Sequence, residues 1–394
     1  MSASGLHKLK IIWCSAGMHL NTGYGKVTRN VVTRLVKNFG LDIICFNPHI
    51  YGAPIYIDGI LQLPKMGHDF GADVVPIYYR VYNRNLLITL WDVWVLHWVR
   101  NHALNWVPYV PIDAPLDEWT IEINEPLNYP QCIAIIAMSR FGEEQIRKVV
   151  RDKPIFYIPH GVDTKLYKPM DKRQCRKELG FEEDVFIFGY VALNIGDRKD
   201  FPCLIKAFRI FLDSNPDARK DARLLLWTNF EPCLGRSFDI ARICRRYGLS
   251  DLVYFPTMQP PNLWYGEDVM VRIYNAMDWY ISTSRGEGFG LPLLEAQACG
   301  VPCIAPDNSA QRELVEGRGI LVKPRYTTYT LCTPTHQEYA VCDPHDVADA
   351  MAKAYNMGVP DSLREKCREF ALHYDWEIIV HKWLEVLGKV ADML

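Results

Sequence analysis

The sequence lacks several features that would identify its class directly. Its 394 residues contain no run of 18 apolar residues, and the N-terminal segment MSASGLHKLKIIWCSAG has an apolar stretch too short for a signal peptide. The 12 cysteines are scattered from Cys14 to Cys367 without a C-x-x-C pair, and the closest two are Cys299 and Cys303. We therefore expect no export, no membrane span and no zinc site, and we expect reduced thiols in a cytoplasmic protein.

The charge of the chain is balanced, which argues against a nucleic-acid partner. There are 44 Lys and Arg against 46 Asp and Glu, with a formal net charge of -2 and no block of like charges. No broad basic surface for a polynucleotide is predicted. With 49% hydrophobic residues over 394 positions, the composition is typical of a globular protein with two or more domains.

Strand-like and helix-like runs alternate along the chain, which predicts α/β layers with parallel sheets. The run LKIIWCSAG is typical of a strand, YGKVTRNVVTRLVKNF has helical spacing, and the alternation restarts at DVFIFGYVAL. Residues 322–339 lack periodicity and are predicted to form a surface excursion. We predict one domain over residues 1–165, a second over 166–372, and a C-terminal helix over 373–394 that packs toward the first.

The segment SRGEGFGLPLLE, residues 284–295, carries the most specific signal. A strand is predicted to end before its glycines, and Pro292 suits the first turn of a helix that stops at Gly300. The N-terminus of such a helix, at the carboxyl edge of an open α/β sheet, offers N–H groups to a phosphate. Ionised carboxylates only accept hydrogen bonds, so Glu287 and Glu295 are expected to bind hydroxyl groups. Together these features predict a nucleotide-sugar site.

The run EGFGLPLLE resembles the E-x(7)-E motif of retaining glycosyltransferases with the GT-B fold, in the fourth glycosyltransferase family. YIPHGVDTKLYKP, with His160 in place of the usual Asn, and ACGVPCIAPDNSAQRELVEGRGILV are also similar to segments of that family. The resemblance covers residues 130–323 and is weaker in the N-terminal half. It implies two Rossmann-like domains facing a cleft, and transfer of a sugar from a UDP- or GDP-sugar to an acceptor hydroxyl.

The resemblance also implies a set of site residues. Those expected to bind the donor are Gly23, Tyr24, Gly25, Gly288, Phe289, Gly290, Leu291 and Glu295, the last at the ribose. Those expected to be catalytic are Glu287, Arg198, Lys199 and Asp113. Arg198 and Lys199 would neutralise the leaving diphosphate, although the usual wider Arg-to-Lys spacing of the family is absent. Asp113 stands where many relatives have a histidine that contacts the sugar.

No metal ion and no cofactor other than the donor is expected, since no D-x-D motif lies in a suitable loop. Structural interpretations of the same residues stay open. NTGYGKV, residues 21–27, also suits an ordinary βα loop, and Arg198 with Lys199 also suits an exposed basic pair. Asp92 and Asp113 are both expected at strand ends. The aromatic residues between Tyr78 and Tyr109 are typical of a hydrophobic core. An acceptor groove or a peripheral membrane contact is an alternative interpretation of them.

Two other functions are compatible with the sequence. One is a different GT-B enzyme, such as a sugar-nucleotide epimerase or a phosphorylase. The other is a non-catalytic subunit that binds a nucleotide sugar or a glycan, which the aspartate at position 113 leaves open. The donor base, the sugar, the acceptor and the oligomeric state do not follow from the sequence.

Overall fold

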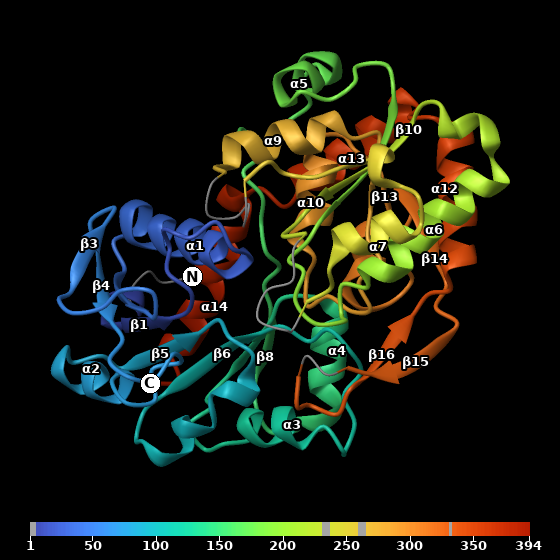
Figure 1. The fold of residues 1–394 in the computed structure, drawn as a ribbon. Helices are drawn as coiled ribbons and strands as arrows, with labels where there is room; N and C mark the ends of the chain where they lie inside the picture. The colour runs from blue at the N-terminus through green and yellow to red at the C-terminus, as the bar shows by residue number, and fades with distance from the viewer. Residues whose placement is uncertain (1–4, 231–236, 259–264, 331–332) are drawn as a thin grey trace. The chain divides into compact units, whose positions relative to one another are not determined.

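The three-dimensional structure is a computed structural model that describes residues 5–230, 237–258, 265–330 and 333–394. The chain forms two compact α/β units (Figure 1). Unit 1 comprises Met1–Ile112, Leu116–Gly161 and Trp376–Leu394, and unit 2 comprises Asp113–Pro115 and Val162–Asp375. The boundaries between the units, at Gly161 and Asp375, lie a few residues from the predicted domain ends at 165 and 372. The inclusion of Asp113–Pro115 in unit 2 was not predicted.

Unit 1 is built on a sheet that is parallel except at one edge. Within the described residues it has eight strands, in the order β3-β4-β2-β1-β5-β6-β7-β8. These are β1 (Lys10–Cys14), β2 (Asp42–Asn47), β3 (Ile55–Ile57), β4 (Ile60–Pro64), β5 (Leu86–Thr89), β6 (Trp106–Val110), β7 (Ile135–Ala137) and β8 (Ile155–Tyr157). Only β3 and β4 pair antiparallel among the strands of this sheet. The strands next to the centre are buried, because helices cover a sheet of this type on both faces.

The helices of unit 1 include a C-terminal helix that is distant in sequence. They are α1 (Gly23–Phe39), α2 (Val75–Val81), α3 (Ile121–Leu127), α4 (Arg140–Val149) and α14 (Trp376–Ala391), with short 3-10 helices η1 (Leu6–Lys8), η2 (Val93–Val95) and η3 (His97–Asn101). Trp383 of α14 is fully buried. Its ring lies 5.3 Å from that of Trp13 in β1 and 5.0 Å from that of Tyr109 in β6. The final helix is thus part of the core of unit 1.

Unit 2 has a parallel sheet whose described residues form six strands in the order β11-β10-β9-β12-β13-β14. The strands are β9 (Phe186–Val191), β10 (Ala222–Trp227), β11 (Val253–Tyr254), β12 (Trp279–Ile281), β13 (Cys303–Pro306) and β14 (Gly319–Val322). The strand order reverses between β9 and β12, which is the switch point where open α/β sheets bind ligands.

Helices cover both faces of this sheet, with α6, α7 and α12 on one side and α9, α10 and α13 on the other (Figure 1). The helices of unit 2 are α5 (Lys172–Leu179), α6 (Phe201–Ser214), α7 (Ile240–Arg246), α9 (Glu267–Ala276), α10 (Leu291–Ala298), α11 (Ser309–Val315), α12 (Pro344–Met357) and α13 (Asp361–Leu372), with η4 (Pro216–Arg219) and η5 (Ser250–Leu252). No described helix combines the length and apolarity that crossing a membrane requires.

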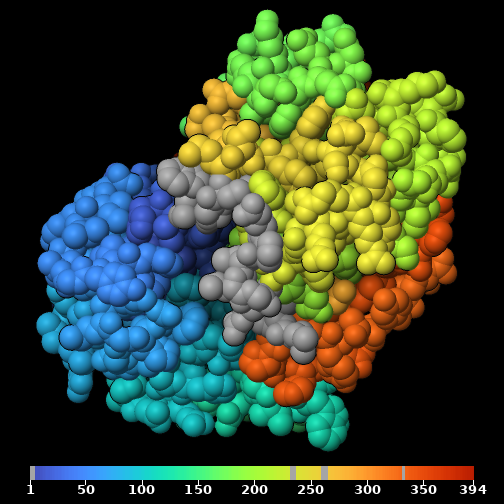
Figure 2. Space-filling view, viewed as in Figure 1, coloured from blue at the N-terminus to red at the C-terminus, as the bar shows by residue number. Residues whose placement is uncertain are grey.

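The predicted surface excursion at 322–339 has structure of its own. Its described part pairs β15 (Tyr326–Tyr329) antiparallel with β16 (Glu338–Val341), and the hairpin lies at the surface in Figure 2. Tyr339 is nevertheless fully buried and Gln337 is 3% exposed. The excursion is therefore anchored in unit 2. Its two residues 331–332 lie outside the described residues.

Candidate active site

Two neighbouring strands of unit 2 bring the predicted catalytic loops together. β9 and β12 pair in parallel, so their carboxyl ends lie at the same edge of the sheet. The loop after β9 carries Arg198 and Lys199, and the loop after β12 carries Glu287. Sequence position alone places these loops almost 90 residues apart, and the strand pairing makes them neighbours.

Four predicted catalytic residues form one cluster of ion pairs. Lys199 pairs with Oε1 of Glu287. Nη1 of Arg198 lies 3.0 Å from Oδ2 of Asp113 and 3.5 Å from Oε2 of Glu287, and it donates a hydrogen bond to the carbonyl of Gly286 at 2.8 Å. These side chains are only 16% to 26% exposed. The interpretation of Arg198 and Lys199 as an exposed basic pair is therefore wrong, because both are held against carboxylates.

Burial and charge act in opposite directions on the three titrating groups of this cluster. Burial alone would raise the pKa of Glu287, but Lys199 and Arg198 hold that pKa below its ordinary value. Burial and the adjacent Arg198 lower the pKa of Lys199, and Glu287 only partly offsets them. Burial raises the pKa of Asp113 even though Arg198 favours its ionised form.

These directions set how the cluster responds to acid. Because the pKa of Glu287 is depressed, its ion pairs stabilise the fold above the ordinary range of a glutamate, and this stabilisation is lost as the pH falls through the depressed value. Because the pKa of Asp113 is raised, the folded state favours its protonated form. In the folded state Asp113 is therefore protonated more readily than an ordinary aspartate on acidification, and Glu287 less readily than an ordinary glutamate.

Asp113 reaches the cluster because Gly286 allows the two chain segments to approach closely. A Cβ atom on Gly286 would lie 2.0 Å from the carbonyl oxygen of Asp113. The amide of Gln337 also donates to the carbonyl of Ala114 at 3.0 Å. These contacts explain why Asp113–Pro115 belongs to unit 2.

Alanine at position 286 is expected to lower the free energy of unfolding by about 1–3 kcal/mol, since its methyl group would overlap backbone atoms that cannot move aside. Gly388 in α14 is the matched control, because a Cβ there meets nothing within 4 Å. Gly388→Ala should stabilise by about 0.5–1 kcal/mol through helix propensity. Denaturant unfolding measures both changes, and equal stability of Gly286→Ala and the unsubstituted protein would contradict the close approach.

The predicted phosphate-binding helix is α10, which begins at Leu291 as the sequence indicated. Gly290 precedes it in the left-handed region, with φ of 98°, and Pro292 occupies its first turn. The side chain of Phe289 is 3% exposed and packs against Tyr374, so only its backbone is available to a donor. Gly288 lies in the same turn.

Glu295 lies within α10 and is only 5% exposed, so it is not a surface glutamate. Its Oε2 accepts a hydrogen bond of 2.6 Å from the hydroxyl of Tyr274 in α9. The structure thus separates the two glutamates of the motif by their partners. Glu287 faces cations, whereas Glu295 faces a phenol.

Gly23, Tyr24 and Gly25 lie in unit 1, in the first turn of α1, and their role in binding the donor stays a prediction. Gly23 begins α1, because the side chain of Thr22 caps the helix by accepting the N–H of Gly25 at 3.2 Å. A Cβ on Gly25 would lie 2.5 Å from the carbonyl of Leu20. This glycine therefore serves the packing of the preceding loop on the helix, and its N–H is used by the cap.

Asp92 and Asp113 lie a few residues beyond the ends of two strands of unit 1. β5 ends at Thr89 and β6 at Val110, whereas Asp92 and Asp113 were expected to end them. Pro111 follows β6 directly, and proline cannot donate to a strand ladder. The chain therefore leaves the sheet before Asp113, which gives that residue the freedom to join unit 2.

Several residues of the site were not predicted. Arg285 forms ion pairs with Asp197 and Asp200, which flank Arg198 and Lys199 in the sequence. Ser309 accepts the backbone N–H of Glu287 at 3.0 Å. Nothing in the spacing of these residues signals the contacts, because each joins loops that only the sheet brings together.

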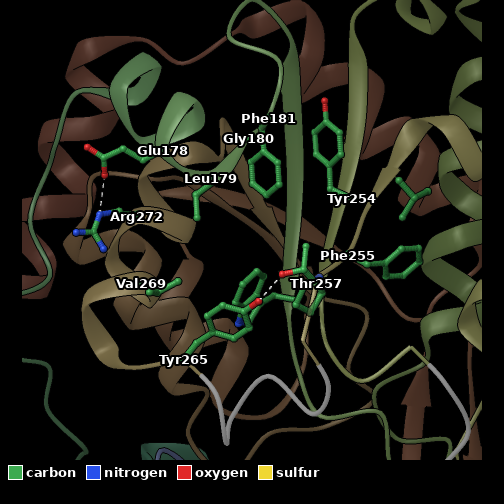
Figure 3. Close-up of a pocket in the computed structure, with 13 residues that line it drawn as sticks. Glu178, Leu179, Gly180, Phe181, Tyr254, Phe255, Thr257, Tyr265, Val269 and Arg272 are labelled. Atoms are coloured by element: carbon green, nitrogen blue, oxygen red, sulfur yellow. Dashed lines mark hydrogen bonds and ion pairs between the residues drawn. The ribbon is translucent and has the colours of Figure 1, made fainter.

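Unit 2 also contains an aromatic pocket of about 660 Å³ beside the edge strand β11. Phe181, Tyr254, Phe255 and Tyr265 line it (Figure 3). Its polar groups are paired with one another: Glu178 with Arg272 at 2.8 Å, and Thr257 with Tyr265 at 2.8 Å. This pocket offers ring faces and no unpaired charge among these groups, so it does not suit a diphosphate.

The described residues contain no group of three or more His, Cys, Asp or Glu side chains arranged to hold a metal ion.

The chain was compared with known families and proteins. Residues 185–356, which include the Arg198 and Glu287 loops, match the family described as "Glycosyl transferases group 1". This segment is similar to the group 1 glycosyltransferases. The family confirms the resemblance noted for the motif. The D-inositol 3-phosphate glycosyltransferase of Actinosynnema mirum is 25% identical over 287 residues, which are 71% of this chain and 63% of that relative. The chain thus spans less than two thirds of that relative's length.

Solved structures extend the likeness to nearly the whole chain. Sucrose-phosphate synthase of Thermosynechococcus elongatus has a TM-score of 0.76 at 19% identity, with 98% of this chain and 100% of that chain covered. HepE of Anabaena, solved in complex with UDP-glucose, has a TM-score of 0.70 at 16% identity, with 97% and 100% covered. Identities this low show the fold alone. The fold of this chain is GT-B, as predicted.

Proposed function

We propose that this protein transfers a sugar from a nucleotide sugar to an acceptor hydroxyl, with retention of the anomeric configuration. The observation that supports the proposal is the cluster in which Arg198 and Lys199 meet Glu287, in the loop that leads into α10. Cations near a helix N-terminus suit a diphosphate, and a carboxylate beside them suits the hydroxyls of a sugar. A nucleotide sugar carries both groups.

We propose UDP- or GDP-sugars as donors, and the UDP-glucose bound to HepE supports a uridine nucleotide. The acceptor hydroxyl of a glycan, lipid or protein is not specified by this cluster. We also propose a cytoplasmic location. It is supported by the described cysteines, which are all free and buried.

In the proposed reaction, Arg198 and Lys199 bind the diphosphate and stabilise the charge that its leaving oxygen gains as the glycosidic bond breaks. The N–H groups at the start of α10 add partial positive charge. Glu287 orients the sugar and favours positive charge on its ring, and Asp113 contacts the sugar beside Arg198. The acceptor hydroxyl attacks from the face on which the diphosphate leaves, which retains the configuration.

Incubation with a panel of UDP- and GDP-sugars tests the activity. We expect slow release of free sugar and nucleoside diphosphate from one donor, because water replaces the absent acceptor. Nuclear magnetic resonance of the first-formed sugar should show the anomeric configuration of the donor. Isomerised nucleotide sugar would indicate an epimerase instead, and binding without turnover would indicate a non-catalytic subunit.

Activity is expected to survive excess chelator. The positive charges of Arg198 and Lys199 and the partial positive charge of the helix N-terminus stabilise the negative charge of the leaving group without a metal ion. The measurement is the rate of donor hydrolysis before and after treatment with EDTA. Loss of activity with recovery on adding magnesium or manganese would contradict metal independence.

A further inference from the structure

Arg285 lies in the loop after β12, and its side chain reaches the loop after β9. Its Nη1 is 2.8 Å from Oδ2 of Asp197, and its Nε is 2.9 Å from Oδ2 of Asp200. These two aspartates immediately flank Arg198 and Lys199. One guanidinium thus joins both ends of the short segment that carries the two diphosphate-binding candidates.

We propose that Arg285 is a positioning residue, whose cation neutralises Asp197 and Asp200 so that Arg198 and Lys199 are available to a diphosphate. The inference rests on the proposed function, because the diphosphate is part of the donor. It assigns Arg285 no contact with the donor itself.

The charges around the segment require such a cation. Arg198 and Lys199 pair with the carboxylates of Asp113 and Glu287. The two aspartates next to them in the sequence, Asp197 and Asp200, pair with Arg285. The side chain of Asp200 is 9% exposed, so water cannot solvate its charge well. Without Arg285, Asp197 and Asp200 would compete with the diphosphate for the two neighbouring cations and would also repel it.

The backbone of the segment is held without the guanidinium. The backbone N–H of Arg285 donates to the carbonyl of Arg198 at 2.8 Å. The hydroxyls of Tyr190 and Thr283 donate to the carbonyl of Lys199 at 3.0 Å and 3.2 Å. A side-chain replacement at position 285 leaves these bonds possible, so the charge of Arg285 can be tested apart from the fold of the loop.

The test measures the binding of uridine and guanosine diphosphate by calorimetry. Arg285→Met keeps the apolar stem and removes the charge, and we expect its dissociation constant to rise by at least about tenfold. Arg285→Lys keeps a cation and should lose less affinity. Arg312→Met is the matched control in the same unit, because Arg312 is 57% exposed and pairs with Asp307 and Glu316. Its affinity should stay within about twofold of the unsubstituted protein.

The double variant Arg285→Met with Asp197→Asn separates charge from mechanical support. The amide introduced at position 197 is neutral, yet its oxygen can still accept the hydroxyl of Thr330 that Asp197 accepts now. If neutralisation is the role, the double variant should regain affinity to within about threefold of the unsubstituted protein. A folded double variant that binds no better than Arg285→Met would overturn the inference.

The outcomes distinguish this inference from the proposed function. If the unsubstituted protein binds neither diphosphate, the proposed donor class fails. If it binds one of them and folded Arg285→Met binds that diphosphate equally well, only the role of Arg285 fails. If Arg285→Met does not fold, Arg285→Lys and Asp197→Asn decide the question. Unchanged diphosphate affinity in both variants supports neutralisation. A loss of diphosphate affinity as large as tenfold in Arg285→Lys overturns it.

Discussion

Glutamine in place of Glu287 is expected to lower turnover by about 100-fold or more, equivalent to about 2.7 kcal/mol. The affinity for the bare nucleoside diphosphate should stay unchanged or rise. The substitution keeps the shape of the side chain and removes its charge, so the loop ahead of α10 retains its packing. The N–H of Glu287 still meets the hydroxyl of Ser309, which the side chain does not affect.

The two expected effects of this substitution have different causes. Positive charge develops on the sugar ring as the glycosidic bond breaks, and a neighbouring carboxylate stabilises that charge only in the transition state. Its loss therefore slows turnover. In the structure the same carboxylate pairs with Lys199 and Arg198, so it competes with a diphosphate for these cations. Its removal therefore does not weaken the binding of the leaving group.

Steady-state kinetics with the cognate donor and calorimetry with the diphosphate measure the two effects. Glu316→Gln is the control, because Glu316 is 63% exposed and pairs with Arg312 at the surface. It should change neither quantity. If Glu287→Gln loses diphosphate affinity in proportion to turnover, Glu287 holds the nucleotide or the loop, and its assignment to the sugar is wrong.

The alternation of apolar patterns was sufficient to predict α/β layers with parallel sheets, and the family resemblance added the GT-B fold. Helix α1 ends at Phe39 and is capped by Gly40 in the left-handed conformation, and Pro292 lies in the first turn of α10, as is typical of these residue types. Such signals are local, so a single sequence reveals them. The cap of Thr22 is local as well, and it places Gly23 and Gly25 in the first turn of the helix.

The sequence named four candidate residues that the structure brings together, but it did not indicate how they pair. Arg198, Lys199 and Glu287 carry a motif, yet nothing in the sequence says that Lys199 pairs with Glu287 or that Asp113 joins unit 2. Those contacts depend on the pairing of β9 with β12 and on the close approach at Gly286. Contacts between loops that are distant in sequence depend on which strands pair in the sheet. Patterns in a single sequence indicate only interactions between residues that are close along the chain.

Glutamine in place of Glu295 is expected to weaken binding of the nucleoside diphosphate by about 1–3 kcal/mol, or roughly fivefold to 150-fold, while the protein stays folded. Glu295 lies in α10 behind the glycine turn and is assigned to the ribose of the donor. An ionised carboxylate accepts two hydroxyl donors, whereas the amide of glutamine offers one accepting oxygen. The loss should therefore appear in binding and not in turnover at saturating donor.

A nucleotide without ribose hydroxyls tests the assignment of Glu295 directly. The unsubstituted protein should prefer uridine diphosphate over its 2′,3′-dideoxy analogue by about tenfold or more, and Glu295→Gln should reduce this preference to about threefold or less. Tyr274→Phe is the control: it removes the phenol that donates to Glu295 at 2.6 Å and leaves the carboxylate. It should keep the preference. A folded Glu295→Gln protein that still discriminates between the two nucleotides would show that Glu295 supports Tyr274 and α9, and does not bind the ribose.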